Sequence, residues 1–281
     1  STVEYFEDRD AFDRQFETDK AGLRDQVEEE IISDHHHAVA EHFDRSPARY
    51  FRTQHSSRIS KHSRHIQRHR VSGSDTPTFD WTEQPTRGWS TLAIVREDKR
   101  GLLAKVAGIM ASARINILGA DLFTRTDGLV LDIFRICTTT LGPVTSKATM
   151  KKVEKGICDA LTGNPPDFPA LIAKARKTIR GDEPDFQIPQ RVYIHEHTQK
   201  DATIVELQVF DRIGLLYEIF AAIAELDFEV TNARISTTCG AAIDTIYLVD
   251  GKGEKLQSKE QLEELRIALE GVARIKAPTP H

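Results

Sequence analysis

Apolar positions follow different periods on the two sides of residue 88. Residues 10–43 carry apolar side chains three or four positions apart, which predicts a helix that ends before Pro47. Residues 54–70 predict a second, basic helix, and the Ser-, Gly-, Thr- and Pro-containing stretch 71–88 predicts a linker. Beyond residue 88, strand-like and helix-like segments alternate. The chain is therefore predicted to be α+β, with a helical N-terminal segment.

The region after residue 88 predicts one order of elements twice. The first copy gives strand, helix, strand, strand and helix over 89–95, 101–113, 115–123, 129–137 and 147–161. The second copy gives the same order over 202–210, 214–226, 228–237, 241–249 and 261–269. Residues 191–195 and 272–275 are predicted as strands that close the first and second sheets, and 168–179 as an extra helix.

The two copies also match residue by residue at an offset of 113 positions. The stretch Asp98-Lys99-Arg100-Gly101-Leu102-Leu103 falls on Asp211-Arg212-Ile213-Gly214-Leu215-Leu216, and Ala120 falls on Ala233. No gap is needed until the hairpin, which indicates duplication of one supersecondary unit. A lone copy would leave an edge strand and an apolar helix face uncovered, so we expect the copies to pack side by side.

Composition narrows the class of protein. The chain has 281 residues, 39% hydrophobic and 29% charged, which suits two or three domains. A net charge of −5 argues against a protein built around nucleic acid, and no apolar run approaches the roughly 18–20 residues of a membrane span. Three cysteines far apart, Cys137, Cys158 and Cys239, suggest a reduced, cytoplasmic protein without structural zinc.

The N-terminal quarter has its own charge pattern. Residues 1–34 hold twelve Asp and Glu against four Lys and Arg, whereas 45–70 hold eight Lys and Arg and no acid. We expect this basic run to meet the acidic N-terminal helix; an acidic partner or nucleic acid are the alternatives. Eight of the eleven histidines fall between 35 and 69. Without a partner carboxylate their spacing favours a polar surface, and no metal site is predicted.

The repeated motif stands where a strand ends and a helix begins. The first N–H groups of a helix lack partners and the helix dipole is positive there, so such a site binds a carboxylate. Gly101 and Gly214 let the backbone approach a ligand or adopt a special dihedral angle, and Asp98 and Asp211 offer acceptors for an ammonium group. The motif thus suits an α-amino acid. The alternative is that the aspartate caps the helix and the glycine makes the turn.

These motifs give a resemblance to a known family. Asp-x-x-Gly-Leu-Leu resembles the signature of ACT domains, and residues 89–276 resemble the C-terminal tandem ACT region of bacterial PII uridylyltransferase/uridylyl-removing enzymes. The stretches that carry it are 116–124, 191–194, 213–219, 233–237 and 244–247, and 47–51 resemble the preceding segment. The resemblance implies two tandem ferredoxin-like βαββαβ domains that sense glutamine. Arg100 and Ile213 depart from it, since the family usually has proline there.

The resemblance also implies where ligand binds: the first strand–helix loop of one domain meets the second strand of its partner. Carried over, the ligand-binding candidates are Asp98, Gly101, Leu102, Leu103, Asn116, Leu118, Asp211, Gly214, Leu215, Leu216, Thr231 and Asn232. The expected domains are a helical segment 1–70, a linker 71–88, and ACT domains at 89–198 and 199–281. We expect a homo-oligomer with an amino-acid ligand and a protein partner at the N-terminal helices.

The family's catalytic motifs have no counterpart in the sequence. Nucleotidyl transfer needs Gly-Ser followed by Asp-x-Asp, but Gly73-Ser74 has no such sequel, and no His-Asp dipeptide exists for the uridylyl-removing metal site. We therefore expect no catalytic residues and no cofactor. The predicted function is amino-acid sensing in nitrogen or amino-acid metabolism without a catalytic domain of its own. The alternatives are a PII uridylyltransferase-type enzyme or a subunit of one, and a nucleic-acid-binding regulator acting through 45–70.

Overall fold

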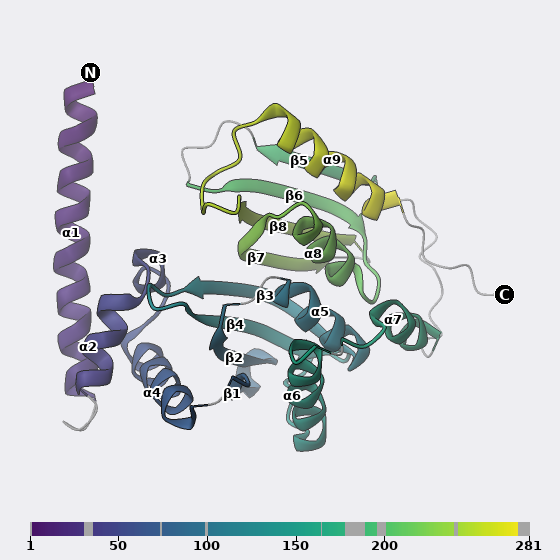
Figure 1. Ribbon diagram of the computed structural model, residues 1–281, viewed down its shortest axis with the longest axis horizontal. Helices are drawn as coiled ribbons and strands as arrows, with labels where there is room; N and C mark the ends of the chain where they lie inside the picture. The colour runs from purple at the N-terminus through teal and green to yellow at the C-terminus, as the bar shows by residue number, and fades with distance from the viewer. Residues whose placement is uncertain are drawn as a thin grey trace. The chain divides into compact units, whose positions relative to one another are not determined.

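The computed structural model contains two compact units (Figure 1). It describes residues 2–30, 36–73, 75–98, 101–163, 165–177, 189–195, 201–238 and 241–274, with side chains from residue 15 onward except at 237 and 238. The first unit comprises 1–78, 95–98 and 123–131. The second comprises 79–94, 99–122 and 132–281.

The first unit is built on helices. They are α1 (Thr2–Glu29), α2 (His36–Arg45), α3 (Ala48–Phe51) and α4 (Ser56–Ser72). Helices α1, α2 and α4 all contact one another, around a core that includes Val27, Val39, Phe43, Tyr50 and Ile59. The basic helix expected at 54–70 is confirmed as α4. The single helix expected over 10–43 is described as two helices, with 31–35 outside the described residues.

The strands form one eight-stranded sheet. They are β1 (Thr78–Gln84), β2 (Trp89–Glu97), β3 (Ile115–Thr124), β4 (Leu129–Thr138), β5 (Arg191–His195), β6 (Thr203–Phe210), β7 (Glu229–Thr238) and β8 (Ala241–Val249). Their order across the sheet is β1-β2-β4-β3-β7-β8-β6-β5. The second half of this order repeats the first half in reverse, so the two copies meet at β3 and β7.

The β3–β7 pair has the register of a two-fold axis. The strands are antiparallel, and Ala120 lies opposite Ala233, its own counterpart at the offset of 113. On either side Gly119 faces Arg234 and Asp121 faces Asn232, two pairings that the same axis exchanges. A two-fold contact uses the same surface on both partners. The prediction that the copies pack side by side is confirmed, and the duplicated unit behaves as a dimer within one chain.

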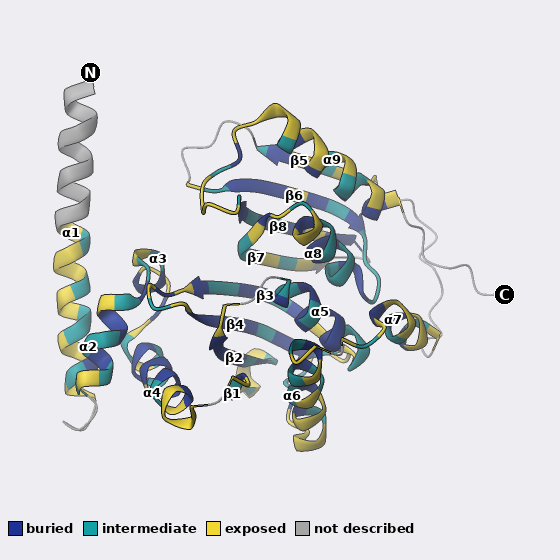
Figure 2. Ribbon diagram, in the orientation of Figure 1, coloured by how far each residue is buried: buried dark blue, intermediate teal, exposed yellow. Residues whose placement is uncertain are grey.

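Helices of the second unit form a row that follows the same symmetry. They are α5 (Leu102–Ser112), α6 (Lys147–Leu161), α7 (Phe168–Lys177), α8 (Leu215–Glu225) and α9 (Lys259–Arg274), and a short 3-10 helix spans Pro85–Arg87. Contacts run α6–α5–α8–α9, with α7 on α5. Their buried sides share one core with the sheet (Figure 2), from Leu92 in β2 to Ala273 in α9. None of the described helices is long and apolar enough to cross a membrane.

The edge strands differ from the prediction in both copies. The expected linker 71–88 contains β1, and β5 pairs with β6 of the second copy, so its expected place in the first sheet is wrong. Thr78 and Arg191, where β1 and β5 begin, are themselves 113 positions apart. The strand expected over 272–275 is also wrong, because residues 272–274 continue the helix α9. The helix extends this far because one of its faces stays buried, with Leu262, Leu265, Leu269 and Val272. The α+β class is confirmed, but each copy runs ββαββα.

Candidate functional site

Both strand–helix loops require their glycine. Gly101 precedes α5 with φ +71° and Gly214 precedes α8 with φ +83°, and both lie in the left-handed region that residues with a side chain rarely adopt. The two helices that begin there, α5 and α8, pack against each other. The repeated glycine thus sets the same entry into a helix twice, on opposite sides of the pseudo-two-fold axis.

The surroundings of the two glycines differ. A Cβ atom at Gly101 would meet nothing within 4 Å, whereas one at Gly214 would lie 2.5 Å from Cγ2 of Ile172. Ile172 belongs to α7, whose Phe168 packs its ring 5.2 Å from that of Tyr217. Helix α7 therefore covers the loop of the second copy. At the offset of 113, Phe168 corresponds to His55 of the first copy, directly before α4 of the first unit.

Two arginines hold α7 and the second loop through one carboxylate. Arg176 of α7 donates from Nε to the carbonyl of Ile213 (2.8 Å) and from a terminal nitrogen to Glu218 Oε1 (2.9 Å). Arg212 donates to the other oxygen of Glu218 and to the carbonyl of Val272 (2.9 Å). The side chain of Arg212 is only 4% exposed, and its Nε and Nη1 find no hydrogen-bond partner among the described residues. The first turn of α8 thus carries a bridged carboxylate beside unused donors.

A buried carboxyl group lies near the same loop. Asp244 of β8 is 1% exposed, and neither oxygen makes a good hydrogen bond to a described residue. Burial, and then the neighbouring charge of Asp211, raise the pKa of Asp244 to about 7, although the backbone of Ser236 lowers it slightly. Sequence reasoning missed Asp244 as a site residue. The sequence does contain a signal for it, because an aspartate stands at the fourth position of both β4 and β8. Asp132, the one in β4, is buried as well.

The other predicted ligand residues divide into core and surface positions. Leu102 and Leu215 are buried in the shared core, and Leu103 and Leu216 pack against it half-buried. Asp98 is exposed and belongs to the first unit, where its N–H donates to the carbonyl of Gly128 (3.0 Å). The leucines of the motif therefore serve packing.

Candidates on β3 and β7 take part in strand pairing. Thr231 stands at a register shift in β7 and donates its hydroxyl to the carbonyl of Tyr247 (3.3 Å). The side chain of Asn232 donates to Asp121 across the pseudo-two-fold axis. Asn116 is exposed and hydrogen-bonds Cys137, and Leu118 is half-buried. Asn232 thus joins the copies, a role that the sequence did not suggest.

Comparison with known proteins agrees with this arrangement. The family model of the ACT domain matches residues 90–155, which span β2 to α6 of the first copy. This part of the chain is therefore similar to an ACT domain. Relatives of the chain include the bifunctional uridylyltransferase/uridylyl-removing enzymes of Rhodospirillum rubrum (31% identity over 79% of this chain), Azospirillum brasilense (30% over 64%) and Bradyrhizobium diazoefficiens (31% over 65%). It is thus related to the regulatory region of these enzymes.

The chain matches only part of those relatives. It spans 23% of the Rhodospirillum rubrum enzyme and 19% of the other two. Among solved structures, an aspartate kinase from Synechocystis aligns over 66% of this chain and 26% of its own, with 17% identity and a TM-score of 0.34.

The first unit of the chain buries four of its histidines. His42, His62, His65 and His69 are each at most 5% exposed, so the expected polar surface is wrong at these positions. His42 Nδ1 lies 2.9 Å from a terminal nitrogen of Arg125, and His62 Nδ1 lies 2.9 Å from the Tyr50 hydroxyl. Burial above all lowers the pKa of His62 to about 3. The described residues contain no group of three side chains suited to a metal ion.

Arg125 joins these histidines to the β3–β4 turn within the first unit. Its side chain is 1% exposed and also pairs with Asp127 (3.1 Å), to which Arg70 of α4 binds as well. The N–H of Thr126 donates to the carbonyl of Arg45 (3.0 Å). Arg70 also pairs with Glu41 of α2, which lies within the helix expected over 10–43.

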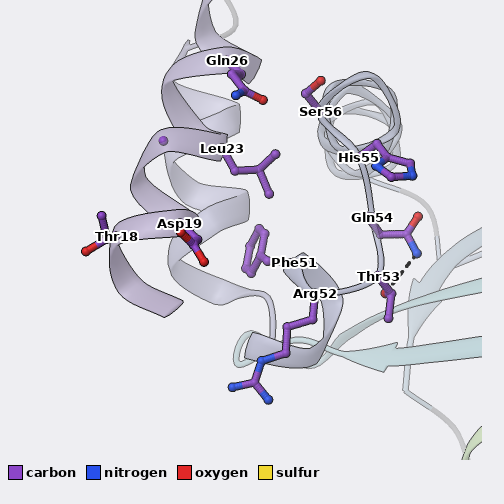
Figure 3. A pocket seen from close by; sticks show the side chains of 11 residues that line it. Thr18, Asp19, Leu23, Gln26, Phe51, Arg52, Thr53, Gln54, His55 and Ser56 are labelled. Carbon is purple, nitrogen blue, oxygen red and sulfur yellow. Dashed lines mark hydrogen bonds between the residues drawn. The ribbon is translucent and has the colours of Figure 1, made fainter. Parts of the chain in front are cut away.

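Two cavities lie apart from the repeated loops. One of about 560 Å³ in the first unit is lined by α1 and by residues 51–56; Figure 3 shows Leu23 and Phe51 facing each other across it. The other, of about 530 Å³ in the second unit, lies among α5, α6 and α7 and is lined by Arg114, Lys152, Lys155 and Lys174 around apolar residues. Neither contains a predicted ligand residue.

Proposed function

We propose that this chain is a tandem ACT regulatory protein that binds an amino acid at its strand–helix loops. The observation that carries the proposal is the two-fold register of β3 and β7, with Ala120 opposite Ala233. It supports two equivalent ferredoxin-like units whose loops flank a shared interface. Both loops enter a helix through a left-handed glycine, and the first N–H groups of such a helix can donate hydrogen bonds to a carboxylate.

The polar groups around the loops suit both ends of an amino acid. The carboxylate would take the first N–H groups of α5 or α8, and the ammonium group would take Asp98 or Asp211, as the sequence suggests. Glutamine is the first candidate, because the resemblance to the regulatory region of the uridylyltransferase/uridylyl-removing enzymes implies a domain pair that senses glutamine. Asn116, Leu118, Thr231 and Asn232 remain proposed neighbours of the ligand, with Thr231 and Asn232 also serving strand pairing.

The two loops differ in how closely they are packed, and this difference predicts how many ligand molecules one chain binds. The glycine of the first loop has open space around it, whereas the glycine of the second loop is packed under α7. We therefore expect one amino acid per chain, at the first loop. Binding would favour one packing of the two copies, and a coupling of about 1–3 kcal/mol is typical of such regulation.

The proposal also covers localisation, catalysis, oligomeric state and domain boundaries. We propose a cytoplasmic regulator in nitrogen metabolism that has no catalytic residues or cofactor, forms homo-oligomers and contacts a protein partner through its N-terminal helices. Each ACT unit would begin at its edge strand, at residue 78 and at residue 191, ahead of the expected boundaries 89 and 199. Uridylyl transfer and nucleic-acid binding through 45–70 stay alternatives.

Calorimetric titration with each of the twenty amino acids at millimolar concentration tests the proposal. We expect saturable heat from glutamine or a close relative, with one site per chain. The Asp98→Ala variant should weaken it about tenfold or more, because a charge-assisted hydrogen bond contributes roughly 1.5–3 kcal/mol. If no amino acid gives heat or shifts the melting temperature, the small-ligand proposal fails.

A further inference from the structure

We infer that α7 is a reversible cover over a second carboxylate site, formed by Arg212 and the first turn of α8, in which Glu218 now holds the place of a ligand carboxylate. The inference rests on the proposed function, because it assigns that function's second loop a regulated state. The ligand class is a small carboxylate such as an amino acid. The cover decides whether the chain binds one ligand or two.

The first argument is the way in which Glu218 is held. One of its oxygens accepts a charge-assisted hydrogen bond from Arg176 and the other accepts one from Arg212, so two separate guanidinium groups hold one carboxylate. Glu218 lies in the first turn of α8, where the helix dipole favours negative charge. An internal carboxylate therefore occupies the position that suits an anionic ligand.

The second argument is that Arg212 has hydrogen-bond donors without an acceptor. Its side chain is 96% buried, yet Nε and Nη1 find no acceptor among the described residues. A buried guanidinium normally satisfies its donors, because an unpaired buried donor is costly. Arg212 lies two residues ahead of Gly214 and reaches the first turn of α8 through Glu218. The unused donors thus belong to the same helix start as Glu218.

The third argument is the contrast between the two copies. At the offset of 113, Glu218 corresponds to Lys105 and Arg212 to Lys99, so the first copy carries no internal carboxylate at this position. Ile172 and Arg176 of α7 close the second loop, while Gly101 has open space. Cover and internal carboxylate therefore occur together, on one copy only. A cover that merely filled space would not need a carboxylate bridged by two arginines.

Hydrogen bonds of Arg176 tie α7 to the loop of the second copy, and they can be weakened by changing a single partner. Arg176 donates to the carbonyl of Ile213 and to the carboxylate of Glu218. The apolar anchors of α7 are Phe168 against Gly108 and Tyr217, and Ile172 against Gly214. Weakening the Arg176–Glu218 pair should therefore raise the fraction of chains in which α7 is open.

Hydrogen exchange and ligand counting on the full chain test the inference. Glu218→Gln keeps the shape of the side chain but removes its charge, and Lys177→Gln is the control, because Lys177 is an exposed cation of α7. We expect exchange of α7 amides to rise about fivefold or more in Glu218→Gln and to stay unchanged in Lys177→Gln. Equal exchange in the two variants would overturn the cover.

The ligand arm uses L-glutamine as the probe. Wild type should bind one molecule per chain, Glu218→Gln two, and the double variant Glu218→Gln/Arg212→Gln one again. A Glu218→Gln protein that still binds one, although wild type binds normally, overturns the second site and leaves the proposed function standing. If wild type binds nothing, the proposed function fails, while the exchange comparison still decides whether α7 opens. A purely structural role for Glu218 predicts lower stability without any gain in binding.

Discussion

Replacing Gly214 with alanine should destabilise the second unit much more than the same change at Gly101. Both positions have positive φ, +83° and +71°, so each alanine pays about 1–2 kcal/mol for a left-handed conformation. At Gly214 the new Cβ would also lie 2.5 Å from Cγ2 and 3.0 Å from Cδ1 of Ile172. Overpacking typically adds about 1–3 kcal/mol. We therefore expect a loss of roughly 2–5 kcal/mol for Gly214→Ala and about 1–2 kcal/mol for Gly101→Ala.

Urea unfolding followed by tryptophan fluorescence measures this difference, since both tryptophans, Trp81 and Trp89, lie in the second unit. Ile172→Ala completes a double-mutant cycle: it creates a cavity of its own but removes the clash, so the pair should show a favourable coupling of about 1–3 kcal/mol. Equal losses at Gly214 and Gly101, or no coupling with Ile172, would refute the packing of α7 on the second loop.

Three further predictions concern buried polar groups. Because the pKa of Asp244 is about 7 in the folded state and near 4 in the unfolded chain, stability should fall as pH rises from about 4 to 7; Asp244→Asn should flatten that fall in melts at pH 5 and 8. The pKa of His62 is lowered to about 3, so the first unit should lose stability as pH falls below about 6.5, and helicity that survives unchanged at pH 4 would contradict this. Arg125→Ala should destabilise the first unit by about 3 kcal/mol, because it removes a buried guanidinium that hydrogen-bonds His42 and pairs with Asp127; a change under about 0.5 kcal/mol in urea melts would count against it.

The regular elements were largely predictable because they depend on local periodicity. The repeat at an offset of 113 gave the central strands, the helices α5 and α8, and the side-by-side packing. The edge strand β1 was missed because Thr78–Gln84 is mostly polar: its apolar alternation is limited to Phe79 and Trp81, which is shorter than in a central strand. The partner of β5 was not predictable either, because an edge strand's own sequence does not say which sheet it joins.

The candidate site was predictable only where one motif carries it. Gly101 and Gly214 have the special dihedral angles that the repeated motif requires. The cover by Ile172 and Arg176 comes from a segment about 40 residues before the loop, and such packing leaves no local pattern. Asp244 is part of an apolar strand, and its significance depends on Asp211 lying close by in three dimensions.

Hydrogen exchange of the full chain with and without millimolar L-glutamine tests the central claim most directly, because it shows where an amino acid binds. We expect exchange to slow at the first turn of α5, directly after Gly101, since the ligand carboxylate would accept hydrogen bonds from those N–H groups. Slowing confined to the helices around the cavity of Figure 3, or no change with any of the twenty amino acids, would contradict amino-acid sensing at the strand–helix loops.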